Sequence, residues 1–289
     1  MSAAADVVLD YLLAQADVIA GRADDVRADA PDAVHRSRVA TRRSRSALRT
    51  FAPLFRRRAV RTLRDELAWH ADHLGAPRDA EVLKERLLAA LATLPDDPAS
   101  GAVAERLTAS LDDTHARAHA SLVESMDTDR YPAMRATLDR FLADPPVRKS
   151  ARGAGIEALP GLLERAVDRV GRLTERAAEI DEDAHRWHEV RKAAKAARYC
   201  SEALVPAFRD AADTLAEAWE QVTEALGEHQ DTVVAEAYLA TEAVRADEAG
   251  EPAGGYLALI ALELRLREES LHTGQAALHA ALALPLPRG

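Results

Sequence analysis

Cysteine is nearly absent from this chain of 289 residues, in which Cys200 is the only example. An intramolecular disulfide is therefore excluded, and this cysteine content is typical of a reducing compartment. Aromatic residues are scarce, at 4% of the sequence, and no run of about 18 apolar residues occurs that would span a membrane. The N-terminus has neither the basic start nor the cleavage site of a signal peptide. We expect a soluble cytoplasmic protein that does not contact a membrane.

Acidic residues are missing from one stretch of the chain. Residues 34–64 hold 11 Lys or Arg and no Asp or Glu, although the whole chain has a net charge of −10. A second basic segment, residues 186–199, contains Glu189 as its single acid. The basic charge is therefore local and the rest of the chain is acidic, which argues against general nucleic-acid binding.

Helical periodicity runs through almost the whole sequence, and no stretch of alternating β-branched residues predicts a strand. Breakers between the periodic segments, among them residues 95–98, predict about ten helices with short connections. Gly75 and Gly227 are expected to end helices, with Pro77 and Asp79 in the first turn of the helix after Gly75. The predicted fold class is all-α.

The chain also contains an internal repeat. Residues 34–55 align with residues 187–208 without a gap, which pairs His35 with His188. After a shift of one residue, residues 74–82 align with residues 226–234. Two segments that repeat in the same order predict two similar halves, 1–145 and 146–289, each a bundle of four or five helices.

On a helix, each copy of the first segment separates a cationic face from an apolar face. The cationic faces hold His35, Arg38, Arg42, Arg45 and Arg49 in the first copy and His188, Arg191, Lys195 and Arg198 in the second. The predicted core faces hold Val34, Ala40, Thr41, Ala47, Leu48 and Phe51, and then Trp187, Val190, Ala194, Ala197, Cys200 and Leu204. The position of Cys200 favours a buried, unreactive thiol over a nucleophile.

A cationic face is usually solvated or paired within the protein, and this interpretation stays open. A solvated helix normally mixes charges of both signs, because like charges four residues apart repel. Here the like charges continue for 31 residues and recur in the second half, so the pattern favours an anionic ligand. Five further arginines either extend the basic rim or are solvated: Arg56, Arg57, Arg58, Arg61 and Arg64.

The paired motifs resemble those of the CHAD family, the conserved-histidine α-helical domains. The first motif is carried here by His35, Arg38, Val39, Arg42, Arg43 and Arg45, and the second by His188, Arg191, Lys195, Arg198, Tyr199 and Glu202. The resemblance covers nearly the whole chain. It implies two helical bundles related by a pseudo-twofold axis, with a central basic groove that binds inorganic polyphosphate. One departure is Gln230, which stands where the first copy has Arg78.

The resemblance therefore implies a polyphosphate-binding site without catalytic residues, metal or cofactor. Its expected members are His35, Arg38, Arg42, Arg43, Arg45, Arg49, His188, Arg191, Lys195, Arg198 and Tyr199. Many family members carry a triphosphate-tunnel domain marked by Glu-x-Glu-x-Lys, which this sequence lacks, so a stand-alone CHAD protein is expected. Targeting to polyphosphate granules would follow from such binding. We make no prediction about the oligomeric state.

Three rival functions remain as alternatives. Nucleic-acid binding is disfavoured because single-strand binders use exposed aromatic platforms, of which the basic helices offer few. A metal enzyme is disfavoured because the closely spaced histidine pairs lack an obvious third ligand. A phosphate hydrolase would need carboxylates for Mg²⁺, and the repeated Asp79 and Asp231 are explained equally well as helix-start residues or arginine partners. The histidine pairs are His70 with His73, His115 with His119, and His185 with His188.

Overall fold

In the computed structural model the chain is almost entirely α-helical, and the described residues, 2–94, 100–179 and 183–288, contain no β-strand. The all-α prediction and the expected number of about ten helices are confirmed. The predicted break at residues 95–98 lies outside the described residues. The α-helices are α1 (Ala3–Gly21), α2 (Ala23–Arg27), α3 (Ala33–Thr50), α4 (Arg57–Leu91), α5 (Ser100–Asp127), α6 (Arg130–Ala143), α7 (Pro160–Ala178), α8 (Ala184–Phe208), α9 (Asp210–Glu248) and α10 (Gly254–Leu282). Three short 3-10 helices are η1 (Ala52–Leu54), η2 (Lys149–Ala151) and η3 (Ile156–Ala158).

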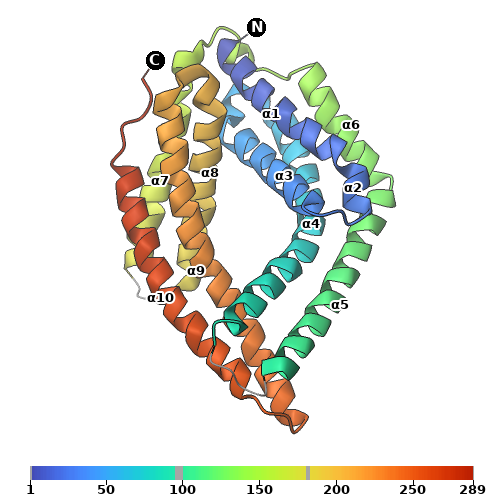
Figure 1. Cartoon of the computed structure of the whole chain (residues 1–289). Coiled ribbons are helices and arrows are strands. Elements are labelled where there is room, and N and C mark those ends of the chain that lie inside the picture. The colour runs from blue at the N-terminus through green and yellow to red at the C-terminus, as the bar shows by residue number, and fades with distance from the viewer. Residues whose placement is uncertain (1, 95–99, 180–182, 289) are drawn as a thin grey trace.

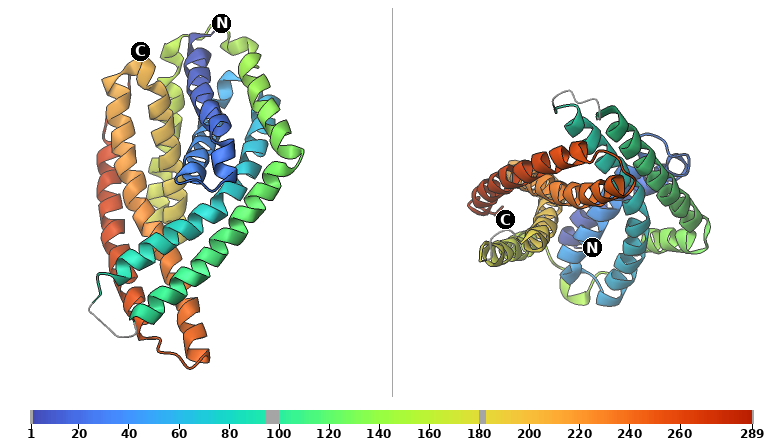
Figure 2. Two further views of the ribbon diagram at one scale, coloured as in Figure 1. Left: turned by 45° about the vertical axis from the view of Figure 1, so that its right-hand side comes forward. Right: turned by 90° about the horizontal axis from the view of Figure 1, so that it is seen from below.

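Two long hairpins, α4–α5 and α9–α10, converge at the end of the molecule opposite to the chain termini (Figure 1). Their tips share a small core that includes Leu87, Leu107, Leu239 and Leu259. The remaining helices gather nearer the termini (Figure 2), around a larger core that draws residues from α1, α3, α6, α7 and α8. Both sequence halves contribute to this larger core, so they fold against each other as one body.

The predicted core faces of α3 and α8 lie inside this larger core. All of their residues are buried, from Val34 to Phe51 in the first helix and from Trp187 to Leu204 in the second. The thiol of Cys200 is among them, and burial raises its pKa above the usual range, as expected for an unreactive cysteine. Because the apolar faces hold both helices in place, their cationic faces take up fixed positions.

The predicted helix ends at Gly75 and Gly227 are wrong, because α4 continues through Gly75 and Pro77 and α9 continues through Gly227. Pro77 removes one backbone donor from α4, but packing on both sides outweighs this local cost. The glycine at 227 has another use. A Cβ atom there would lie 2.9 Å from a guanidinium nitrogen of Arg191, so the glycine lets that side chain lie against α9 without shifting.

The start of α8 and its connection to α9 bring these two helices together. The Asp183 carboxylate accepts hydrogen bonds from the backbone N–H groups of His185 and Arg186, at 3.0 and 3.2 Å, and so caps α8. A single residue, Arg209, with a φ of 48°, separates α8 from α9. This tight turn places α9 along α8, as α4 lies along α3 in the first half.

Candidate functional site

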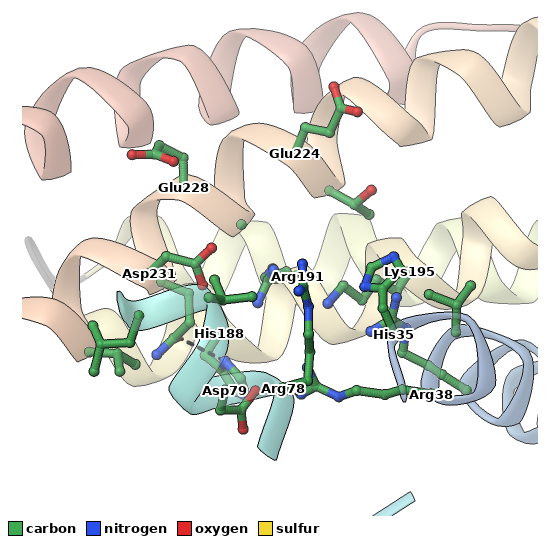
Figure 3. A pocket seen from close by; sticks show the side chains of 18 of the residues that line it. His35, Arg38, Arg78, Asp79, His188, Arg191, Lys195, Glu224, Glu228 and Asp231 are labelled. Atoms are coloured by element: carbon green, nitrogen blue, oxygen red, sulfur yellow. Dashed lines mark hydrogen bonds and ion pairs between the residues drawn. The ribbon is translucent and has the colours of Figure 1, made fainter. Parts of the chain in front are cut away.

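A cavity of about 570 Å³ lies where α3, α4, α8 and α9 meet (Figure 3). The four helices come from matching parts of the repeat, so both halves build one site, as the repeat predicted. Seven Lys or Arg side chains line the cavity: Arg38, Arg42, Arg78, Arg86, Arg191, Lys195 and Arg198. Four carboxylates also line it: Asp79, Glu224, Glu228 and Asp231.

Eight of the eleven residues predicted for the site line this cavity. They are His35, Arg38, Arg42, His188, Arg191, Lys195, Arg198 and Tyr199. The other three, Arg43, Arg45 and Arg49, do not line it. Arg43 points from α3 towards α8, where its Nε lies 2.9 Å from a carboxylate oxygen of Glu202. Arg45 and Arg49 lie one and two turns beyond Arg42 on α3.

Three cations at the centre of the cavity, Arg42, Arg191 and Lys195, form no ion pair with a described residue. We call them the central cation cluster. The guanidinium Nε of Arg191 is buried and has no hydrogen-bond partner in the described part of the chain. Burying like charges together costs free energy unless an anion joins them, so this cluster is prepared for an anionic ligand.

The electrostatics of Lys195 reflect this crowding. Burial, followed by the charges of Arg191, Arg42 and Arg38, lowers the pKa of Lys195 to about 6, and the charge of Asp231 only partly opposes the shift. In the empty cavity at neutral pH, the amine of Lys195 is therefore mainly uncharged. A bound polyanion would return its proton.

The two motif histidines lie near the starts of α3 and α8, and both have pKa values below the ordinary range. Burial is the main cause for each, followed by the charge of Arg78 for His35 and of Lys192 for His188. The Nδ1–H of His188 donates to the side-chain oxygen of Gln230 at 2.8 Å. Where the second half has this neutral amide, the first half has a cation, so the two histidine sites are not equivalent.

The remaining cations of the cavity have carboxylate partners. Arg38 pairs with Asp79 at 2.9 Å, and Arg78 with Glu81 at 2.7 Å. Arg86 lies 2.7 Å from Glu228 and 2.7 Å from the fully buried Glu263, whereas Arg198 pairs with Glu202 and Glu220. The pairing of Arg38 shows that Asp79 is an arginine partner, one of the two roles considered for it. The central cation cluster therefore shares the cavity with arginines that are already paired with carboxylates.

Tyr199 orders the arginines at one end of the cavity. Its hydroxyl accepts a hydrogen bond from Arg42 Nε at 2.8 Å. The guanidinium groups of Arg42, Arg43 and Arg198 lie 5.6–5.9 Å from the centre of its ring. Cation–π contacts of this kind hold the guanidinium groups in place and leave the ring buried, so it offers no stacking face to a base.

Sequence reasoning missed Glu224 and Glu228 on the acidic side of the cavity, and it did not assign Arg78 or Arg86 to the site. Glu224, Glu228 and Asp231 project from α9 opposite the cations (Figure 3). Their spacing of four and three residues places them on one helix face, a signal that the sequence does contain. Arg78 lies within the repeated segment 74–82, whereas Arg86 lies on α4 outside both repeated segments and reaches the site through the packing of α4 against α9 and α10.

Of the histidine pairs considered as metal ligands, His115 and His119 bond to other groups of the protein. His115 bonds to Asp29 at 2.8 Å and to the carbonyl oxygen of Pro77 at 3.1 Å, and His119 donates to the carbonyl oxygen of Val26 at 2.8 Å. No group of three His, Cys, Asp or Glu side chains suited to a metal ion occurs in residues 2–94, 100–179 and 183–288. In the same residues, every helix is too short or too polar to cross a membrane.

Two curated relatives are 33% identical to this chain over 262 residues, which cover 88% of it. They are the uncharacterized protein Rv2226 of Mycobacterium tuberculosis strain H37Rv and the uncharacterized protein MT2285 of strain CDC 1551. The matched region is 48% of each relative, so the chain spans about half of their length.

Two solved structures share the fold. PptA from Streptomyces chartreusis superposes with a TM-score of 0.77 at 25% identity, over 97% of this chain and 99% of that one. The CHAD domain of the plant Ricinus communis superposes with a TM-score of 0.73 at 24% identity, over 99% of this chain and 94% of that one. The sequence pattern of the CHAD domain matches residues 10–240, which is most of the chain. The chain therefore belongs to the CHAD family.

Proposed function

We propose that the cavity between the two halves binds inorganic polyphosphate without turning it over. The proposal rests on the central cation cluster, Arg42, Arg191 and Lys195. These three side chains line one cavity, and none of them forms an ion pair with a carboxylate of the described residues. A linear polyphosphate offers repeated negative charge and no bases, which suits guanidinium groups that bind oxygens in pairs. Membership of the CHAD family supports the same ligand. In a cytoplasmic protein, this binding would serve attachment to polyphosphate granules.

Two rival functions receive less support. The ring of Tyr199 is buried and in contact with guanidinium groups, so it cannot stack on the bases of a nucleic acid as the aromatic residues of single-strand binders do. A hydrolase would use the carboxylates of α9 to hold Mg²⁺. Glu228 is already engaged by Arg86, and the burial that raises the pKa of Asp231 disfavours its charged form. Binding without turnover therefore agrees better with the site.

The test is a competition for a labelled polyphosphate between unlabelled polyphosphate and a single-stranded oligonucleotide with the same number of phosphates. We expect the oligonucleotide to compete at least about tenfold less well, because its bases gain no stacking in this cavity. Release of inorganic phosphate is measured in parallel, with and without Mg²⁺. Equal competition would favour a nucleic-acid site, and enzyme-dependent phosphate release would favour a hydrolase.

The salt dependence of binding provides a second prediction. The central cation cluster supplies three phosphate contacts, and Arg38 adds a fourth if the ligand displaces its exposed partner Asp79. With about 0.7 counterions released per contact, the affinity should fall roughly 20- to 50-fold between about 50 and 200 mM salt. Isothermal titration calorimetry with one polyphosphate of defined length measures this slope. An affinity that does not change with salt would mean that the cations of the cavity do not carry the binding.

A further inference from the structure

The arginine face of α3 continues beyond the cavity. Arg45 and Arg49 follow Arg42 on the same helix face, and Arg49 lies close to Arg64 of α4 and Arg169 of α7. Partial burial, followed by the charges of Arg64, Arg169 and Arg45, lowers the pKa of the Arg49 guanidinium. The contacts of α3 with both α4 and α7 agree with this placement. We call Arg45, Arg49, Arg64 and Arg169 the distal arginine cluster.

The distal arginine cluster has no neutralising partner within the described part of the chain. None of its members forms an ion pair with a described residue. The Nε of Arg64 is buried and has no hydrogen-bond partner there. Arg49 and Arg169 are exposed, so an anion can reach them. Four like charges without an acid are unfavourable in the empty protein and become favourable when an anion binds.

The repeat shows that this end of the site differs from its counterpart. In the second half, the guanidinium of Arg198 is neutralised by Glu202 at 2.9 Å and by Glu220. In the first half, the position that matches Glu202 holds an arginine, so this neutralising group is missing. The matched pairs are Arg45 with Arg198 and Arg49 with Glu202.

We propose that the distal arginine cluster is a second anion subsite, which receives the part of a polyphosphate chain that extends out of the cavity. The inference rests on the proposed function of the cavity. Arg42 and Arg49 are seven residues apart on one helix, so about 10 Å of helix axis separates the two subsites. A long chain can reach both subsites at once, and its second contact is then intramolecular. The protein should therefore prefer long polyphosphates to tripolyphosphate.

The test uses the double variant Arg49→Gln with Arg169→Gln and two probes, tripolyphosphate and a long-chain polyphosphate. We expect the affinity for the long chain to fall roughly ten- to a hundredfold, because two phosphate contacts and the intramolecular gain are lost. The affinity for tripolyphosphate should change by less than about twofold, since the central cation cluster is untouched. The matched control is Arg140→Gln with Arg265→Gln, which removes the same charge from exposed positions on α6 and α10. Circular dichroism checks the fold of both variants.

The outcomes separate this inference from the function on which it rests. An equal loss for both probes, or an equal loss in the control variant, would overturn the second subsite in favour of a general charge effect. Unchanged binding of the long chain would also overturn it, while the function of the cavity would stand. If the unsubstituted protein binds neither probe, the proposed function itself fails.

Discussion

Removing four cations from the floor of the cavity is expected to lower the affinity for polyphosphate by about 10³-fold or more. Each charge-assisted hydrogen bond to an anion contributes roughly 1.5 kcal/mol or more, and the four contacts act on one ligand. The substitutions are Arg38→Ala, Arg42→Ala, Arg191→Ala and Lys195→Ala. A binding isotherm with long-chain polyphosphate measures the loss.

The fold should survive these substitutions, because the four side chains lie on the faces of α3 and α8 that point away from the core. Removing the central cation cluster also relieves repulsion, so the melting temperature should not fall. The control variant replaces four exposed arginines elsewhere with alanine and should bind nearly normally: Arg117, Arg140, Arg245 and Arg265. A cavity variant that keeps both its helicity and its affinity would contradict the assignment of the site.

The affinity for polyphosphate should also rise as the pH falls from about 8 to about 6. Lys195, with a pKa lowered to about 6, is mainly uncharged in the empty cavity at pH 8 and about half protonated at pH 6. The charged groups around it are Arg38 and Arg42 from α3, Arg191 from α8 and Asp231 from α9. The net charge near the amine is therefore positive in the empty cavity, and a bound polyanion makes it negative. Binding then takes up a proton, and each proton taken up increases affinity about tenfold per pH unit. The increase over two units should approach about 50-fold, because the amine of the empty cavity is itself about half protonated at pH 6.

Calorimetry in two buffers with different ionisation enthalpies counts the protons taken up. The variant Lys195→Met should lose most of the pH dependence. The pH dependence that remains should come from His35 and His188, whose pKa values are also lowered. A ligand that itself titrates would show the same pH dependence with both proteins, so the variant separates the two sources. Binding without net proton uptake would contradict the protonation of Lys195 by the ligand.

The sequence predicted those features of the site that depend on a single helix, namely which side chains of α3 and α8 face the core and which face away from it. The apolar and cationic faces of α3 and α8 follow from a rotation of about 100° per residue, and every predicted core residue of these faces is buried. The repeat predicted that both helices would share one site, since matched faces in two similar halves can meet about an axis between them. The error at Gly75 and Gly227 has the opposite origin, because local helix-ending signals were overruled by long-range packing.

The sequence by itself determined the all-α fold, the repeat, the two amphipathic helices and the cationic side chains that point away from the core. All of these depend on the period of a helix and on the order of residues along it. Only the tertiary structure decided which cations are free. The partners of Arg86 are Glu228 and Glu263, far along the chain on α9 and α10, and the neighbours of Arg49 come from α4 and α7. Whether an arginine is neutralised depends on what packs within a few ångströms of it, and that distance is set by how the helices cross.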